Sequence, residues 1–125
     1  DLLALIIILD QFPRNMFRNT AQAFATDAQA VALTKYALSN NYPQELAVEQ
    51  QIFLYMPLMH SENKADQALS IELFRALGKE DNLNFAIKHQ DIIVRFGRFP
   101  HRNQILGRES TQAEAEFLTQ PGSSF

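Results

Sequence analysis

The sequence predicts an all-α fold, and three observations support this prediction. Glycine is scarce, with 4 in 125 residues, whereas alanine, leucine, glutamine and glutamate are frequent, and this composition favours helices. No segment alternates polar and apolar residues over the length of a strand, and apolar residues instead recur at helical spacing. The turns between these segments are short, so we expect a single domain of antiparallel helix pairs.

The first predicted helix covers residues 1–10 and is almost entirely apolar, which is typical of a buried helix. Its apolar run is far shorter than the ~20 residues that a membrane span requires. Because proline pushes the residue before it out of the helical region, Pro13 should end this helix and leave residues 11–20 irregular. The chain begins at Asp1, inside an element and without methionine, so we expect an N-terminal helical segment to precede it.

The next two helices are separated by a turn. Thr26 or Asp27 is expected to cap a second helix that ends near Asn40. A third helix is predicted over residues 44–59. It is apolar on all sides, so we place it at the centre of the fold, and Pro57 should kink it near its end.

The fourth and fifth helices both end at a glycine. Ser61 is expected to cap a helix over residues 63–77, which Gly78 ends in the left-handed conformation. A further helix is predicted over residues 82–96 and ends before Gly97. Its predicted buried stripe consists of Phe85, His89, Ile92, Ile93 and Phe96.

The last predicted helix is short. Thr111 and Glu114 have the spacing of a capping box, which indicates a helix over residues 112–119. The tail, residues 121–125, is expected to be extended, with Phe125 either docked or frayed.

The composition excludes several kinds of site. There is no cysteine, which excludes disulfides, thiolate zinc sites and cysteine nucleophiles. The net charge is −3, which does not favour a nucleic-acid partner. No metal-ligand spacing, phosphate loop or dinucleotide motif is present, so we predict neither a metal nor a cofactor. We expect a cytoplasmic protein that does not enter a membrane, and the sequence leaves the oligomeric state open.

The basic residues gather in two windows that contain no carboxylate. The windows are residues 11–26 and 92–108, and together they hold six of the eleven basic residues, all of them arginine. Each window contains a Phe-Pro pair that is followed by arginine and asparagine, and each comes after a predicted helix. Helix pairs bring equivalent turns to one edge, so we expect the two windows to converge.

We interpret the two windows as the walls of an anion-binding pocket. Its candidate residues are Arg14, Asn15, Arg18, Arg95, Arg98, His101, Arg102, Asn103 and Arg108. The planar guanidinium fork suits a carboxylate or a phosphate, so the ligand would be an acidic peptide or a small phosphorylated or carboxylated metabolite. In the alternative interpretation the arginines are structural and pair with Asp10, Asp27, Glu62, Asp66 and Asp91.

Two further hypotheses stay open. The chain would be a small hydrolase if His60 or His101 acted as a general base, oriented by Glu62 or Asp66 and aided by an arginine. His89 lies on an apolar stripe and is expected to be a core residue. The chain would be a scaffold for a protein partner if the arginines were purely structural.

Five segments carry a resemblance to a known family. In chain order they read LDQFPRN at residues 9–15, AFATD at 23–27, YMPLMHSE at 55–62, RFGRFPHRN at 95–103 and GREST at 107–111. They are similar to the bacterial domain-of-unknown-function family number 924, a group of tetratricopeptide-like helical proteins. The resemblance implies an α–α superhelix of antiparallel pairs and an upstream aromatic-rich segment, and it implies no reaction.

Overall fold

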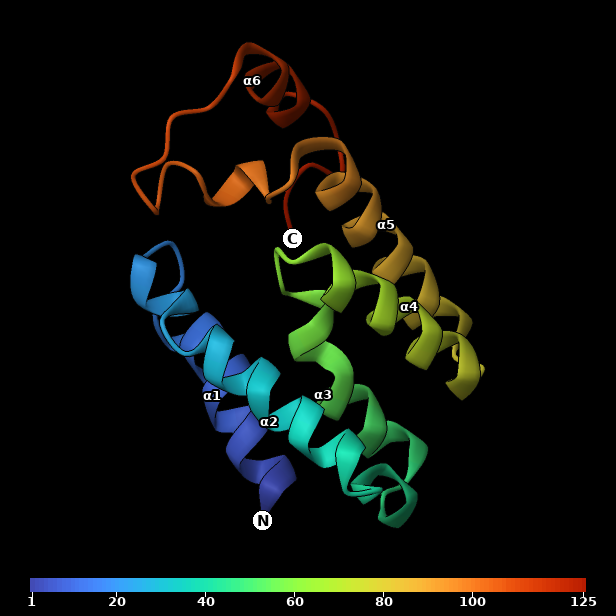
Figure 1. Ribbon diagram of the computed structural model, residues 1–125. Helices are drawn as coiled ribbons and strands as arrows, with labels where there is room; N and C mark the ends of the chain where they lie inside the picture. The colour runs from blue at the N-terminus through green and yellow to red at the C-terminus, as the bar shows by residue number, and fades with distance from the viewer.

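The computed structural model describes residues 1–125 and is all-helical, as the sequence predicts (Figure 1). Its elements are α1 (Leu2–Met16), η1 (Ala21–Phe24), α2 (Asp27–Ser39), η2 (Tyr42–Glu45), α3 (Val48–Met59), α4 (Lys64–Leu77), α5 (Glu80–Phe96), η3 (Pro100–Arg102) and α6 (Gln112–Leu118), where η denotes a 3-10 helix. It contains no strand. None of its helices has the length and apolar character that a membrane crossing would need.

The helix α3 lies at the centre of the fold. It packs against α1, α2, α4 and α5, and it contributes Leu54, Tyr55 and Met59 to the main hydrophobic core. A smaller core at the end of α5 contains Ile92, Ile93 and Phe99, and α6 packs over it through Phe117. This second core fixes the segment after α5 against the rest of the molecule.

Helix α1 continues beyond the point where the sequence predicts its end. It passes through Pro13 and ends at Met16, so the prediction that proline terminates it was wrong. Pro13 has no N–H to give to the carbonyl of Leu9, four residues earlier. The hydroxyl of Thr26 donates to that carbonyl at 2.6 Å instead. A partner that is distant in sequence therefore satisfies the acceptor that proline leaves free.

The start of α4 also differs from the prediction. Its N-cap is Asn63, whose side-chain oxygen accepts the backbone N–H of Asp66 at 3.0 Å. Ser61, the predicted cap, accepts the N–H of Asn63 at 3.1 Å and donates to the Asp66 carboxylate at 2.6 Å. Ser61 thus braces the turn before the helix. Gly78 ends α4 in the left-handed conformation, with φ of 70°.

Smaller corrections concern α3 and α5, whereas the start of α6 agrees with the prediction. Helix α3 begins at Val48, because η2 occupies the residues before it. Phe85 on α5 is 53% exposed, and Ala86 takes the buried position that the apolar stripe predicts for Phe85. The capping box of α6 forms as predicted: the Thr111 hydroxyl accepts the Glu114 N–H at 3.1 Å, and the Glu114 carboxylate accepts the Thr111 N–H at 2.9 Å.

Several chain segments meet at one end of the helical body. The C-terminal end of α1, the N-terminal end of α2 and the turn between α3 and α4 all lie there (Figure 1). The segment after α5 lies across the same end, because Arg102 donates to the carbonyl of His60 at 2.8 Å and the N–H of Phe99 donates to Glu62 at 2.6 Å. This end carries the candidate site.

Candidate functional site

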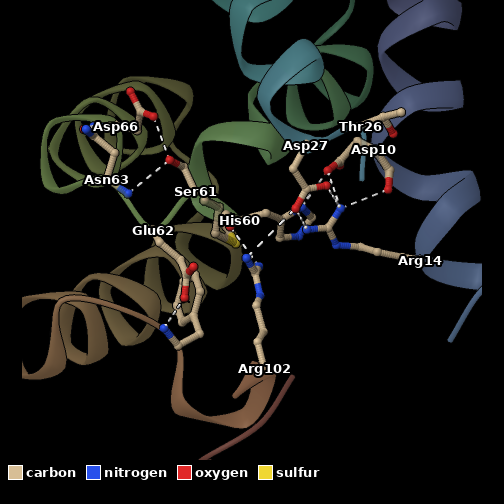
Figure 2. A network of polar contacts seen from close by, with 12 residues as sticks. Asp10, Arg14, Thr26, Asp27, His60, Ser61, Glu62, Asn63, Asp66 and Arg102 are labelled. Carbon is tan, nitrogen blue, oxygen red and sulfur yellow. Dashed lines mark hydrogen bonds and ion pairs between the residues drawn. The ribbon is translucent and has the colours of Figure 1, made fainter. Parts of the chain in front are cut away.

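Arg14 ties α1 to the start of α2. Its Nη1 lies 2.8 Å from Asp10 Oδ1, one helical turn earlier. The same guanidinium binds Asp27 in a bidentate manner, with both N···O distances at 2.9 Å. Figure 2 shows Arg14 directed towards both carboxylates. Such forked pairs fix orientation as well as charge, so the end of α1 is held rigidly.

Asp10 also orients a histidine from the far end of α3. Asp10 is 1% exposed, and its Oδ1 lies 2.8 Å from His60 Nδ1. Burial raises the pKa of Asp10, but His60 and Arg14 lower it by more, so the carboxyl is ionised. An ionised carboxylate only accepts, so we assign the ring hydrogen of His60 to Nδ1. The Nε2 atom forms no hydrogen bond within the protein.

Arg102 is a buried cation between two aromatic rings. Its side chain comes from η3, and the residue is 6% exposed. The guanidinium carbon lies 4.4 Å from the ring centroid of Phe24 and 4.6 Å from that of Phe99. Its nearest carboxylate oxygen, on Asp27, is 3.9 Å away, and its Nε is buried without a partner. Burial, reinforced by the charge of Arg14, lowers the pKa of Arg102 to about 10, so it stays charged at neutral pH.

These side chains border a hollow of about 390 Å³, which we call the arginine hollow. Its lining includes three arginines and three histidines, which are Arg14, Arg18, Arg102, His60, His89 and His101. Two asparagines, two phenylalanines, an alanine and an isoleucine complete it, namely Asn15, Asn19, Phe24, Phe125, Ala23 and Ile105. No aspartate or glutamate lines the arginine hollow.

The other two histidines of the arginine hollow are uncharged at neutral pH. Burial lowers the pKa of His89 to about 4 and also that of His101 to about 4, where Arg102 adds to the effect. His89 Nδ1 lies 2.7 Å from the carbonyl of Phe85, and its ring stacks on Phe125 with the centroids 3.8 Å apart. Phe125 therefore packs against His89 on one side, while 52% of the residue stays exposed.

The structure brings together five of the nine predicted pocket residues. Arg14, Asn15, Arg18, His101 and Arg102 all line the arginine hollow, although they come from the two separate sequence windows. The convergence has a local cause, since Arg14 and Arg102 approach the same carboxylate, Asp27. His60 joins them from α3.

The other four predicted residues lie elsewhere and have structural partners. Arg98 binds Glu114 through two contacts, at 2.8 Å and 2.7 Å. Arg108 contacts the two carboxylate oxygens of Glu62 at 2.9 Å and 3.1 Å. Asn103 is 1% exposed and accepts from Arg108 at 3.0 Å, while Arg95 is exposed and lies over the ring of Phe96 at 4.6 Å. The structural interpretation, in which the arginines pair with carboxylates, therefore fits Arg98 and Arg108, whereas Arg95 has no carboxylate partner.

Glu62 and Asp66 do not orient a histidine, contrary to the prediction for an enzyme. Glu62 is engaged by Arg108 and by the N–H of Phe99, which closes the turn after α5. Asp66 accepts from Ser61 at 2.6 Å and pairs with Lys35 at 2.7 Å. The carboxylate that does contact a histidine is Asp10.

Sequence reasoning missed the roles of Asp10, His89 and Phe24. The sequence indicates Asp10 only as a partner for an arginine, and no local pattern links it to a histidine fifty positions later. His89 and Phe24 lie on elements where core packing explains their residue types equally well. In the whole structure, no group of three or more His, Asp or Glu side chains is arranged to hold a metal ion.

Comparisons with known proteins give a family and a fold relative. A family model described as "Bacterial protein of unknown function (DUF924)" matches residues 1–122. The chain is also similar to the solved structure of ATU0120, a protein of unknown function from Agrobacterium tumefaciens, with a TM-score of 0.89 and 44% sequence identity. The match covers 94% of this chain and 66% of that one, so the chain spans just under two thirds of the relative's length. No curated protein matches the chain.

Proposed function

We propose that this chain, which belongs to the DUF924 family of bacterial proteins of unknown function, binds a small phosphorylated or carboxylated metabolite in the arginine hollow. One observation carries the proposal: three guanidinium groups line a concave site whose lining includes no aspartate or glutamate side chain. A cleft lined by one sign of charge concentrates ions of the opposite sign. The bidentate geometry of arginine then favours carboxylate or phosphate oxygens.

The charge balance around the arginine hollow supports an anionic ligand. Three guanidinium charges, on Arg14, Arg18 and Arg102, face two carboxylates, Asp10 and Asp27, which leaves one positive charge. Arg14 is matched by both carboxylates. Arg18 is exposed and forms no ion pair, and the one ion-pair contact of Arg102 is the 3.9 Å approach to Asp27. The uncompensated charge therefore belongs to Arg18 and Arg102.

The size of the hollow favours a metabolite over an acidic peptide. Its 390 Å³ falls within the range of about 300–1,000 Å³ that is typical of small-molecule sites. A peptide would fit only by its terminal residue. We therefore choose the small ligand, and we expect the apolar rings of Phe24 and Phe125 to contact its carbon skeleton.

We further propose that the helices form a tetratricopeptide-like superhelix and that the protein acts in the cytoplasm. Each of the helices α1 to α5 packs against the next one along the chain, which is the neighbour relationship of such repeats. Membrane lipids and nucleic acids are not among the proposed partners, because the chain is acidic overall.

The binding proposal is tested by calorimetry with inorganic phosphate and citrate, together with the thermal stability of the protein in each. We expect both anions to bind, with affinity that weakens as sodium chloride is added. Arg18→Gln should weaken binding several-fold and leave the fold intact, because Arg18 is exposed. The matched control is Arg95→Gln, an exposed arginine outside the hollow. Absence of binding by both anions, or equal loss in the two variants, would refute the proposal.

A further inference from the structure

We propose that His60, oriented by Asp10, is a general base and that the arginine hollow hydrolyses phosphate monoesters. This inference rests on the proposed function, because the substrate is itself an anion held by the guanidinium groups. It adds a reaction, which binding alone does not require. The inference depends on how His60 is held, on what surrounds its free nitrogen and on which nucleophile is present.

The imidazole of His60 is held in one orientation. Asp10 accepts its Nδ1–H at 2.8 Å, and Asp10 is itself fixed by Arg14 at 2.8 Å (Figure 2). Gln11 also donates to Asp10, at 2.9 Å. The side chain of His60 is 16% exposed, and the residue borders the arginine hollow. Its Nε2 makes no hydrogen bond within the protein, so the lone pair on this nitrogen is left to accept a proton.

His60 differs from the other two histidines of the hollow in having an anionic partner. When Nε2 accepts a proton, the charge of the resulting imidazolium is stabilised by the Asp10 carboxylate. The Nδ1 of His89 faces a neutral backbone carbonyl, and the Nδ1 of His101 is buried with no partner. Among the side chains that line the hollow, His60 is thus the one equipped to take up a proton.

The nucleophile in this scheme is water. No serine, threonine, tyrosine or cysteine lines the hollow, so no side-chain hydroxyl or thiol is placed to attack. Water attacks the phosphorus atom while His60 Nε2 removes its proton, and the bond between phosphorus and the ester oxygen breaks. The departing oxygen lies on the opposite side of the phosphorus and takes its proton from solvent, while His60 returns the proton it accepted to solvent, which gives an alcohol and inorganic phosphate. Arg18 and Arg102 stabilise the charge on the non-bridging oxygens.

Isotope exchange tests the reaction without knowledge of the natural substrate. Inorganic phosphate labelled with heavy oxygen is incubated with the full chain in ordinary water, where attack of water on bound phosphate replaces the label. Hydrolysis of p-nitrophenyl phosphate is monitored in parallel. We expect the wild-type chain to catalyse both reactions. We expect His60→Asn to slow both by about 10²–10⁴-fold, while it still binds phosphate.

Asp10 is a positioning residue, and its role is tested by a pH profile. The groups that face His60 are Asp10 and Arg14 on α1, Arg102 in η3 and His89 on α5. Burial, together with Arg14 and Arg102, lowers the pKa of His60, and Asp10 opposes them by raising it. Asp10→Asn should therefore move the acidic limb of the rate profile to lower pH and reduce the maximal rate. A purely structural role for Asp10 would leave the position of this limb unchanged.

The outcomes separate the two proposals. If phosphate binds but neither labelled phosphate nor p-nitrophenyl phosphate reacts, the inference about His60 is wrong and the binding proposal stands. Full activity in His60→Asn would overturn the inference as well. If phosphate does not bind, the proposed function is wrong, and the inference about His60 that rests on it is wrong as well. Arg95→Gln serves as the control and should exchange label at the wild-type rate.

Discussion

The hydroxyl of Thr26 donates to the carbonyl of Leu9 at 2.6 Å, and this carbonyl is the one that Pro13 leaves without a helical donor. Thr26 lies immediately before α2, so the bond joins the end of α1 to the start of the next helix. It also helps to hold Arg14, one residue after the proline, in position beside Asp27.

Removal of this hydroxyl should destabilise the protein measurably. Thr26→Val keeps the side-chain shape and leaves the Leu9 carbonyl without a donor, which should cost about 1–3 kcal/mol in the free energy of unfolding. The measurement is urea denaturation. Thr20→Val is the matched control, because Thr20 makes a bond of the same length, 2.6 Å, at an exposed site where water replaces it. Equal effects of the two substitutions would contradict the explanation for the continuation of α1.

The ion pair of Arg98 with Glu114 should make the free energy of unfolding depend on pH in the acidic range. The Arg98 hydrogen bond, the Thr111 N–H and the nearby Asn103 together outweigh burial and lower the pKa of Glu114 from 4.5 to about 2. As the pH falls, Glu114 becomes protonated at a higher pH in the unfolded chain than in the folded protein. The stabilisation that it provides should therefore be complete above pH 4.5 and be lost as the pH drops from 4.5 to about 2. Glu114→Gln keeps the capping hydrogen bond and should reduce that dependence. Glu116→Gln, an exposed neighbour, should not, and unfolding curves at each pH provide the comparison.

His89 and His101 should become protonated only at a lower pH than an ordinary histidine. Burial lowers the pKa values of His89 and His101 to about 4, whereas in the unfolded chain both titrate near 6.5. The unfolded state thus binds more protons between these values, so stability should decrease as the pH falls from 6.5 to about 4. Proton NMR of the imidazole C–H signals gives the pKa values directly. Signals from both residues that titrate near 6.5 would contradict the burial seen here.

Glu62 should hold the segment after α5 in place. It binds Arg108 and also accepts the N–H of Phe99, so Glu62→Ala leaves both donors without their acceptor. We expect a loss of about 1–3 kcal/mol and faster proteolysis within residues 97–125. Limited proteolysis combined with mass spectrometry locates the cleavage. Glu72→Ala, at an exposed position on α4, is the control and should leave the cleavage rate unchanged.

Much of the fold was predictable because its signals are local. The glycines at 78 and 97 mark the ends of α4 and α5, and the capping box at 111 marks the start of α6. The end of α1 was not predictable, because the group that lets the helix pass Pro13 belongs to Thr26, which lies elsewhere in the sequence. The tendency of Pro13 to end the helix was overcome there by a tertiary hydrogen bond.

The candidate site was predictable only in part. The exclusion of carboxylates from two sequence windows indicated the arginines, but it did not distinguish Arg102, which faces the hollow, from Arg98 and Arg108, which bind Glu114 and Glu62. The pairing of Asp10 with His60 depends on how α1 packs against α3, and composition and periodicity carry no information about it.

The walls of the arginine hollow come from segments that lie far apart in the sequence, since Arg14 belongs to α1 and Arg102 to η3. Contacts between such distant positions require a large loop to close, and they form late in folding. A nascent chain that has made only the first helices therefore has no cavity. A ligand of the hollow would bind only folded molecules in which these segments have met. By joining them it would slow unfolding and reduce cleavage by proteases.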